Sequence, residues 1–163
     1  MWFLPLIFIG AIVLLKYSDL ATGQTMLDRM EIRSAVLRHT TGTGIDPRVV
    51  MGIIWRESRG SPTNYVGDTT LPGGPSVGPM QVYFATATAL GLFKGTKEQY
   101  LAQAKDESQG IAWGVAVLKE KLRIAKGNVP EAIKRYNGSG SSAEKYRDGV
   151  LEFLKQTYGM VLT

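Results

Sequence analysis

The stretch IDPRVVMGIIWRES, residues 45–58, carries the clearest helix signal in the chain. Asp46 is placed to cap the first turn of a helix, and Pro47 suits the first helical position because its missing N–H is not needed there. We therefore predict a helix from Pro47 to about Ser58. Its apolar residues recur at helical spacing, so that one face of this helix is expected to be buried.

Glu57 falls on the apolar face of this predicted helix. It completes the i, i+3, i+4, i+7 series that begins with Val50, Ile53 and Ile54. Burial there would disfavour the charged carboxylate and raise its pKa, as a general acid working near neutral pH requires. Because Glu57 stands in the last turn among basic residues, a surface ion pair is the competing interpretation. The spacing alone leaves both interpretations open.

Outward from this helix, the chain is predicted to be mostly α-helical. Glycine and proline are dense from Gly60 to Pro79, which excludes a long helix and favours a loop or a small sheet. Long irregular segments inside compact domains are usually functional. Apolar periodicity predicts an earlier helix that ends near Arg38 and later helices over residues 84–90, 106–126, 130–136 and 143–158.

The composition excludes several kinds of site. The chain has 163 residues, 44% hydrophobic and 20% charged, as expected for one globular domain. It has no cysteine, which removes thiol nucleophiles, disulfides and Cys-ligated zinc. A single histidine, His39, argues against a zinc site built on several imidazoles, and we expect no metal. The net charge of +5 is scattered along the chain, so no nucleic-acid partner is predicted.

The N-terminal segment carries the membrane signal of this sequence. Residues 1–15, MWFLPLIFIGAIVLL, contain no charged side chain, and Lys16 follows them. As a helix this run would span about 22 Å, short of the roughly 30 Å hydrocarbon core unless Lys16 extends towards the headgroups. We predict an uncleaved anchor helix over residues 1–18, a linker over 19–25, and a domain over 26–163 that works outside the cytoplasm. A cleaved export signal and a buried core helix are the alternatives.

Three motifs together resemble a known enzyme family. The motifs are Glu57-Ser58, Gly78-Pro79-Met80-Gln81-Val82 and Tyr136-Asn137-Gly138. In order and spacing they are similar to the lytic transglycosylase (goose-type lysozyme-like) domain of peptidoglycan-cleaving enzymes. The resemblance covers roughly residues 45–157 and implies a mainly α, lysozyme-like α+β fold in a single domain, with no metal or organic cofactor.

The resemblance also implies a reaction. Glu57 would be the catalytic acid/base that cleaves the β-1,4 bond between N-acetylmuramic acid and N-acetylglucosamine and leaves a 1,6-anhydro product. The attacking oxygen comes from the substrate itself, so one carboxyl is enough where most glycoside hydrolases need two. The residues that the resemblance assigns to substrate binding are Ser58, Gly78, Met80, Gln81, Tyr136, Asn137 and Tyr146.

The resemblance also implies a role for each of these residues. The Ser58 hydroxyl would bond Glu57 or the substrate, and Gly78 would let the backbone approach the sugar. Met80 would form an apolar wall of the cleft, and the Gln81 amide would bond polar groups of the sugar. The remaining three would stand close to the glutamate: Tyr136 with its hydroxyl directed at the carboxyl, Asn137 facing an acetamido group, and Tyr146 nearby.

Several functions remain open at this point. The first is an anchored lytic transglycosylase that opens the cell wall locally, for genome delivery by a phage virion or for a conjugation or secretion machine. The domain would then stand at a virion membrane or on the periplasmic side of the bacterial inner membrane. The second is a lysozyme-type hydrolase in which Asp68 holds a water as second carboxylate. The third is a non-catalytic peptidoglycan-binding or assembly protein, which would have been free to lose Glu57.

Overall fold

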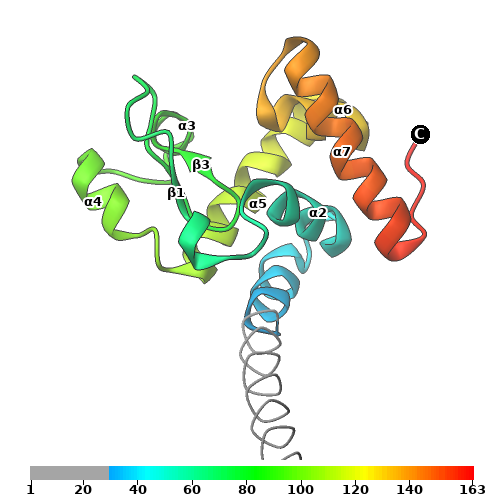
Figure 1. Cartoon of the computed structure of the whole chain (residues 1–163), viewed down its shortest axis with the longest axis horizontal. Coiled ribbons are helices and arrows are strands. Elements are labelled where there is room, and N and C mark those ends of the chain that lie inside the picture. The colour runs from blue at the N-terminus through cyan, green and yellow to red at the C-terminus, as the bar shows by residue number, and fades with distance from the viewer. Residues whose placement is uncertain (1–29) are drawn as a thin grey trace, which may run out of the picture. The chain divides into compact units, whose positions relative to one another are not determined.

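Helices form most of the part of the protein that the structure describes, and a small sheet lies beside them (Figure 1). The computed structural model describes residues 30–163, so the predicted anchor and linker lie outside the described residues. Within residues 30–163, no helix has the length and apolar composition needed to cross a membrane. Residues 30–40 are helical, and the later elements are α2 (Pro47–Glu57), β1 (Val66–Gly67), β2 (Ser76–Val77), β3 (Val82–Tyr83), α3 (Phe84–Ala89), α4 (Lys97–Ala102), α5 (Glu107–Ile124), α6 (Val129–Asn137) and α7 (Gly140–Tyr158).

Helix α2 begins at Pro47, as the sequence predicts. The Asp46 side chain accepts a hydrogen bond of 2.8 Å from the backbone N–H of Arg48, and Pro47 occupies the first turn. The apolar face of α2 is fully buried, with Val50 and Ile53 both 0% exposed. The mainly α, lysozyme-like α+β fold class is therefore confirmed for the part of the chain that the structure describes.

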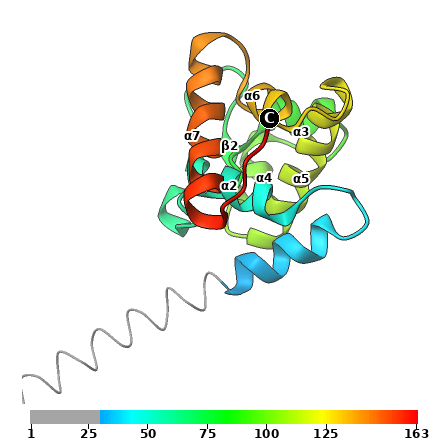
Figure 2. The same ribbon diagram turned by 90° about the vertical axis from the view of Figure 1, so that its right-hand side faces the viewer.

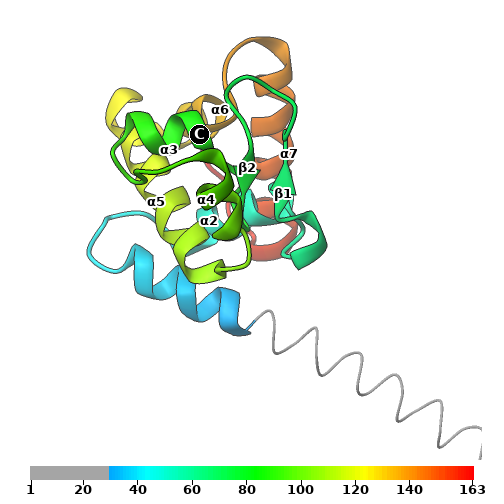
Figure 3. The same ribbon diagram turned by 90° about the vertical axis from the view of Figure 1, so that its left-hand side faces the viewer.

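Helix α2 packs against α7, and α6 packs against both α5 and α7. Figure 1 shows α6 and α7 on one side of the domain, the sheet with α3 and α4 on the other, and α2 and α5 between them. Figure 2 views the domain from the α7 side, and Figure 3 from the side of α3 and α4. Gly52 allows the close approach of α2 to α7, because a Cβ there would lie 3.1 Å from Cγ1 of Val150.

The glycine-rich segment forms a small antiparallel sheet with the order β1-β2-β3. Val77 of β2 pairs with Val66 on one side and Val82 on the other. We call residues 66–83 the flap. A turn before β3, closed by a 3.1 Å bond from the Gln81 N–H to the Gly78 carbonyl, connects β2 to β3. The prediction of a loop or small sheet between Gly60 and Pro79 is confirmed.

Two features of the fold differ from the prediction. Helix α4 was not predicted: it has six residues, of which only Tyr100 is buried, so no apolar period marks it. It is held by a capping box between Thr96 and Gln99 and by Tyr100, which is fully buried and donates a 3.0 Å hydrogen bond to the Val82 carbonyl. The last helix, α7, begins at Gly140, three residues before the predicted start at 143.

Candidate active site

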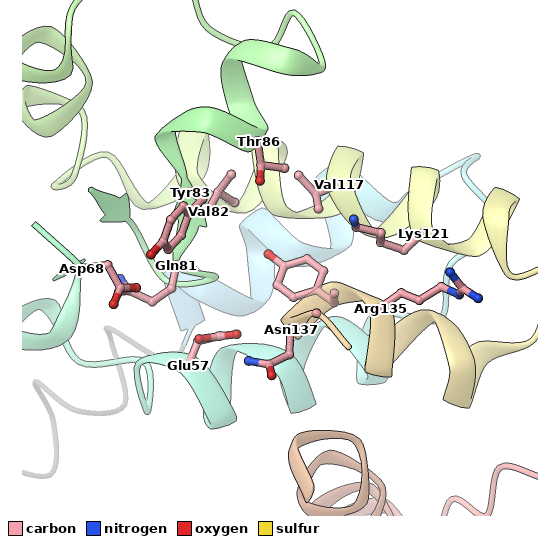
Figure 4. A pocket seen from close by; sticks show the side chains of 12 residues that line it. Glu57, Asp68, Gln81, Val82, Tyr83, Thr86, Val117, Lys121, Arg135 and Asn137 are labelled. Atoms are coloured by element: carbon pink, nitrogen blue, oxygen red, sulfur yellow. The ribbon is translucent and has the colours of Figure 1, made fainter. Parts of the chain in front are cut away.

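A cleft of about 530 Å³ lies between the flap and the helices α2, α3, α5 and α6. Figure 4 shows side chains from the flap and from all four helices around this space. Within residues 30–163 no cluster of His, Cys, Asp and Glu side chains could hold a metal ion. The cleft is lined by Glu57, Asp68, Gln81, Val82, Tyr83, Thr86, Val117, Lys121, Arg135, Tyr136, Asn137 and Gly138.

Glu57 is the last residue of α2 and presents its carboxyl to the cleft. Burial raises the pKa of this carboxyl to about 7, and the negative charge of Asp68 acts in the same direction. A hydrogen bond from Tyr146 and the positive charge of Arg56 oppose the rise without cancelling it. Among the described residues Glu57 forms no ion pair, so the surface ion pair is wrong and the carboxyl is instead half-buried at the cleft.

Tyr146 of α7 positions this carboxyl. Its hydroxyl donates a 2.7 Å hydrogen bond to Oε1 of Glu57. Burial and the neighbouring carboxylate raise the pKa of the Tyr146 hydroxyl well above its ordinary value, so the group stays protonated and remains a donor. Because the tyrosine is only 5% exposed, its ring is fixed by packing. The prediction that Tyr146 stands near the glutamate is confirmed in the structure.

Asp68 and Gln81 approach the same cleft from the flap. The Ser76 hydroxyl lies 3.1 Å from Oδ2 of Asp68 and 2.9 Å from Oε1 of Gln81, and it can donate to either. The Gln81 amide nitrogen donates a 2.9 Å bond to the Gly78 carbonyl. Both Asp68 and Gln81 have positive φ angles, 51° and 48°, which few non-glycine residues adopt. The flap therefore holds these two side chains at the edge of the cleft.

Three predicted binding residues support the flap from the core and do not line the cleft. Ser58 is fully buried, and its hydroxyl donates a 2.8 Å bond to the Pro79 carbonyl, so it ties the end of α2 to the flap and does not bond Glu57. Gly78 has φ 77°, and a Cβ on it would lie 3.0 Å from Cα of Gly110. It is needed for the approach of the flap to α5, and it does not line the cleft.

Met80 is the third of these residues. The sequence predicts it as an apolar wall of the cleft, yet the side chain is fully buried. It packs on Gly114 of α5, where any Cβ would overlap the methionine sulfur. Met80 and Gln81 point in opposite directions from the turn before β3. Met80 therefore enters the core, and Gln81 faces the cleft.

Tyr136 and Asn137 do lie at the cleft, at the end of α6. The Tyr136 hydroxyl donates a 2.9 Å hydrogen bond to the Met80 carbonyl and not to Glu57, which corrects its predicted direction. Burial raises the pKa of this hydroxyl well above its usual range, so it remains a donor to the flap. Figure 4 shows the Asn137 amide beside Glu57, facing the same space.

Sequence reasoning missed five lining residues: Tyr83, Thr86, Val117, Lys121 and Arg135. One signal was available for two of them, because residues 117 and 121 are four apart on α5 and share a helix face. The others come to the cleft only through the packing of α3, α5 and α6. No short motif in the sequence marks them.

A family model covers most of this chain. The family model described as "Transglycosylase SLT domain" matches residues 34–158. The chain belongs to this family. The matched segment of the transglycosylase SLT domain includes every residue that lines the cleft. The family resemblance inferred from the motifs is thereby confirmed.

A phage protein is among the relatives of this SLT domain chain. The "Transglycosylase" of Enterobacteria phage PRD1 is 31% identical over 121 residues. The aligned region covers 71% of this chain and 40% of the phage protein. The chain thus spans well under half the length of that relative. No solved structure matches the chain significantly.

Proposed function

We propose that this protein is a peptidoglycan lytic transglycosylase that uses Glu57 as its catalytic acid/base. The observation that carries the proposal is the Glu57 carboxyl, half-buried at the cleft of a transglycosylase SLT domain with a pKa of about 7. Such a carboxyl is present in both protonation states near neutral pH. A group that first gives and then takes a proton in one turnover needs this property.

The proposed reaction uses one carboxyl twice. Protonated Glu57 gives its proton to the glycosidic oxygen as the bond from that oxygen to C1 of the muramyl sugar breaks. The C6 hydroxyl oxygen of the same sugar then attacks C1, and the Glu57 carboxylate takes the hydroxyl proton. The carboxyl is restored, no water is consumed, and the product carries a 1,6-anhydro ring. The 2.7 Å bond from Tyr146 holds the carboxyl in place during both steps.

The cleft offers polar groups that suit an N-acetylated glycan. Asn137 is exposed beside Glu57, where its amide can bond an acetamido group. The hydroxyls of Tyr83 and Thr86 border the same space and can bond sugar hydroxyls. The core residues Ser58, Gly78 and Met80 support this binding indirectly, because they fix the flap that carries Gln81.

Hydrolysis of the same bond is the second candidate function. Asp68 lines the same cleft, and its charge contributes to the raised pKa of Glu57. A water held by Asp68 could attack C1 in place of the C6 hydroxyl and would give a reducing end. In this case the protein would act as a lysozyme.

Mass spectrometry of digested peptidoglycan distinguishes these functions. We expect the full chain to release fragments lighter by one water than hydrolysis products, and we expect Glu57→Gln to release none. Asp68→Asn should still release fragments with the anhydro mass. Reducing-end products that disappear with Asp68→Asn would establish the hydrolase, and a folded wild-type protein that binds peptidoglycan but releases nothing would be a non-catalytic binder. Glu152→Gln, at an exposed site on α7, is the matched control.

We further propose that the enzyme opens the cell wall locally, most directly for genome delivery by a phage virion. The support is the relative from phage PRD1. The uncharged run of residues 1–15 supports an anchor over residues 1–18 that holds the domain outside the cytoplasm. Alkaline extraction of membranes tests the anchor: the full chain should stay in the pellet, and a chain without residues 1–18 should be released. Release of both would contradict anchoring.

A further inference from the structure

The charges of the cleft are divided between its two ends. Figure 4 shows Glu57 and Asp68 at one end and Lys121 and Arg135 at the other. The reaction proposed above uses the end with the carboxyl groups. It gives the two cations no part, although both line the same continuous space.

Lys121 is the unpaired cation at this end. It is partly buried on α5, and within residues 30–163 it forms no ion pair. Arg135 of α6 forms a 2.8 Å ion pair from Nε to Oε1 of Glu131, which leaves the rest of its guanidinium fork for another acceptor. The pair of cations therefore carries a net positive charge next to Glu131, and this charge faces the cleft.

The walls around Lys121 strengthen its attraction for an anion. Val117, one turn earlier on α5, is 3% exposed and lines the cleft beside it. An apolar wall lowers the local dielectric, and the two cations give this end of the cleft a positive charge that concentrates the field there. Lys121 and Arg135 stand on two different helices, so that an anion between them would be held from both sides.

We propose that the Lys121–Arg135 end of the cleft binds a carboxylate of the peptide that branches from the glycan strand. This inference rests on the function proposed above and adds a substrate preference to it. The hydroxyls and acetamido groups of the glycan are neutral, so they offer the two cations no opposite charge. The peptides carry free carboxylates. The enzyme accordingly prefers peptide-bearing strands over strands in which those carboxylates are neutral.

The test compares ligands of equal size that differ only in charge. The ligand is a tetrasaccharide carrying its peptides, either with free carboxylates or with the same carboxylates converted to amides. Binding is measured by calorimetry on the full chain with Glu57→Gln, which blocks turnover, and kcat/KM is measured on the chain with Glu57 intact. One charge-assisted contact predicts about tenfold tighter binding of the free carboxylate form. The preference should fall as salt is added.

Variants of α5 assign the preference to one residue. Lys121→Met should reduce the ratio of the two affinities from about ten to about two or three, because Arg135 keeps its charge, and Lys121→Arg should keep most of the preference. Lys119→Met is the matched control: Lys119 is exposed, two positions away on the same helix, and does not line the cleft. It should keep the full preference.

Defined results would overturn the inference. Equal binding of the free and amidated ligands, or a preference that Lys121→Met leaves unchanged, would do so. A third ligand, from which the peptides have been removed, leaves a lactyl carboxylate on each muramyl sugar. If this ligand binds as tightly as the peptide-bearing form, the lactyl group and not the peptide is the source of the anion. Cleavage without a charge preference would refute only this inference, whereas preferential binding without cleavage would refute only the proposed activity.

Discussion

Replacing Glu57 by glutamine is expected to make the protein more stable at alkaline pH. In the folded protein burial raises the pKa of Glu57 from 4.5 to about 7. The folded state therefore binds more protons than the unfolded state between these two pH values. The stability that this carboxyl contributes is complete below about pH 4.5 and is lost as the pH rises through about 7.

The size of the effect follows from the two pKa values. A shift from 4.5 to about 7 corresponds to about 3 kcal/mol, at about 1.4 kcal/mol for each factor of ten. Glutamine keeps an oxygen that can accept from Tyr146 and carries no charge, so it avoids the cost of burying a carboxylate. The variant should match the wild type near pH 4.5 and exceed its free energy of unfolding by about 3 kcal/mol at pH 8.

Urea unfolding of the full chain at a series of pH values measures this difference directly. Glu152→Gln is the control, because a substitution at an exposed site usually changes stability by less than about 0.5 kcal/mol. The reasoning would be refuted if Glu57→Gln were no more stable than the wild type at pH 8, or if its advantage were the same at every pH. Either result would mean that ionised Glu57 does not lower the free energy of unfolding.

Three further outcomes are expected. Tyr146→Phe removes a hydrogen bond that favours the charged form of Glu57, so the pKa of Glu57 should rise. The alkaline limb of the pH–rate profile should then move to higher pH, while kcat falls. An alkaline limb at the wild-type pH would contradict this. Gly114→Ala should lower the free energy of unfolding by about 1–3 kcal/mol in urea unfolding, because its Cβ would overlap the Met80 sulfur. The loss should be smaller in a Met80→Ala background, which lacks that sulfur. If the losses of the two single variants simply add in the double variant, the packing of Met80 on Gly114 is contradicted. Ser58→Ala should cost about 1–3 kcal/mol, because a buried carbonyl loses its donor, and a neutral result would show that the flap does not need this link.

The local features of the fold could be predicted from the sequence. Asp46 and Pro47 mark the start of α2 by capping and by a fixed φ angle, which depend on a few adjacent residues. The same periodicity puts Glu57 on the buried face, as the structure confirms. The motif resemblance brought the flap and the end of α6 into the same hypothesis. Capping and periodicity each depend on residues that are close together in the chain, so a single sequence is enough to show them.

Only the tertiary structure decided what each site residue touches. The donor to Glu57 is Tyr146, 89 positions away, whereas Tyr136 bonds the Met80 carbonyl. Nothing in the spacing of two tyrosines tells which one reaches the carboxyl, because the answer depends on how α6 and α7 pack on α2. The same holds for Lys121, whose neighbours across the cleft belong to other helices. Sequence periodicity determines which face of a helix is buried, and the packing of distant helices determines what that face meets.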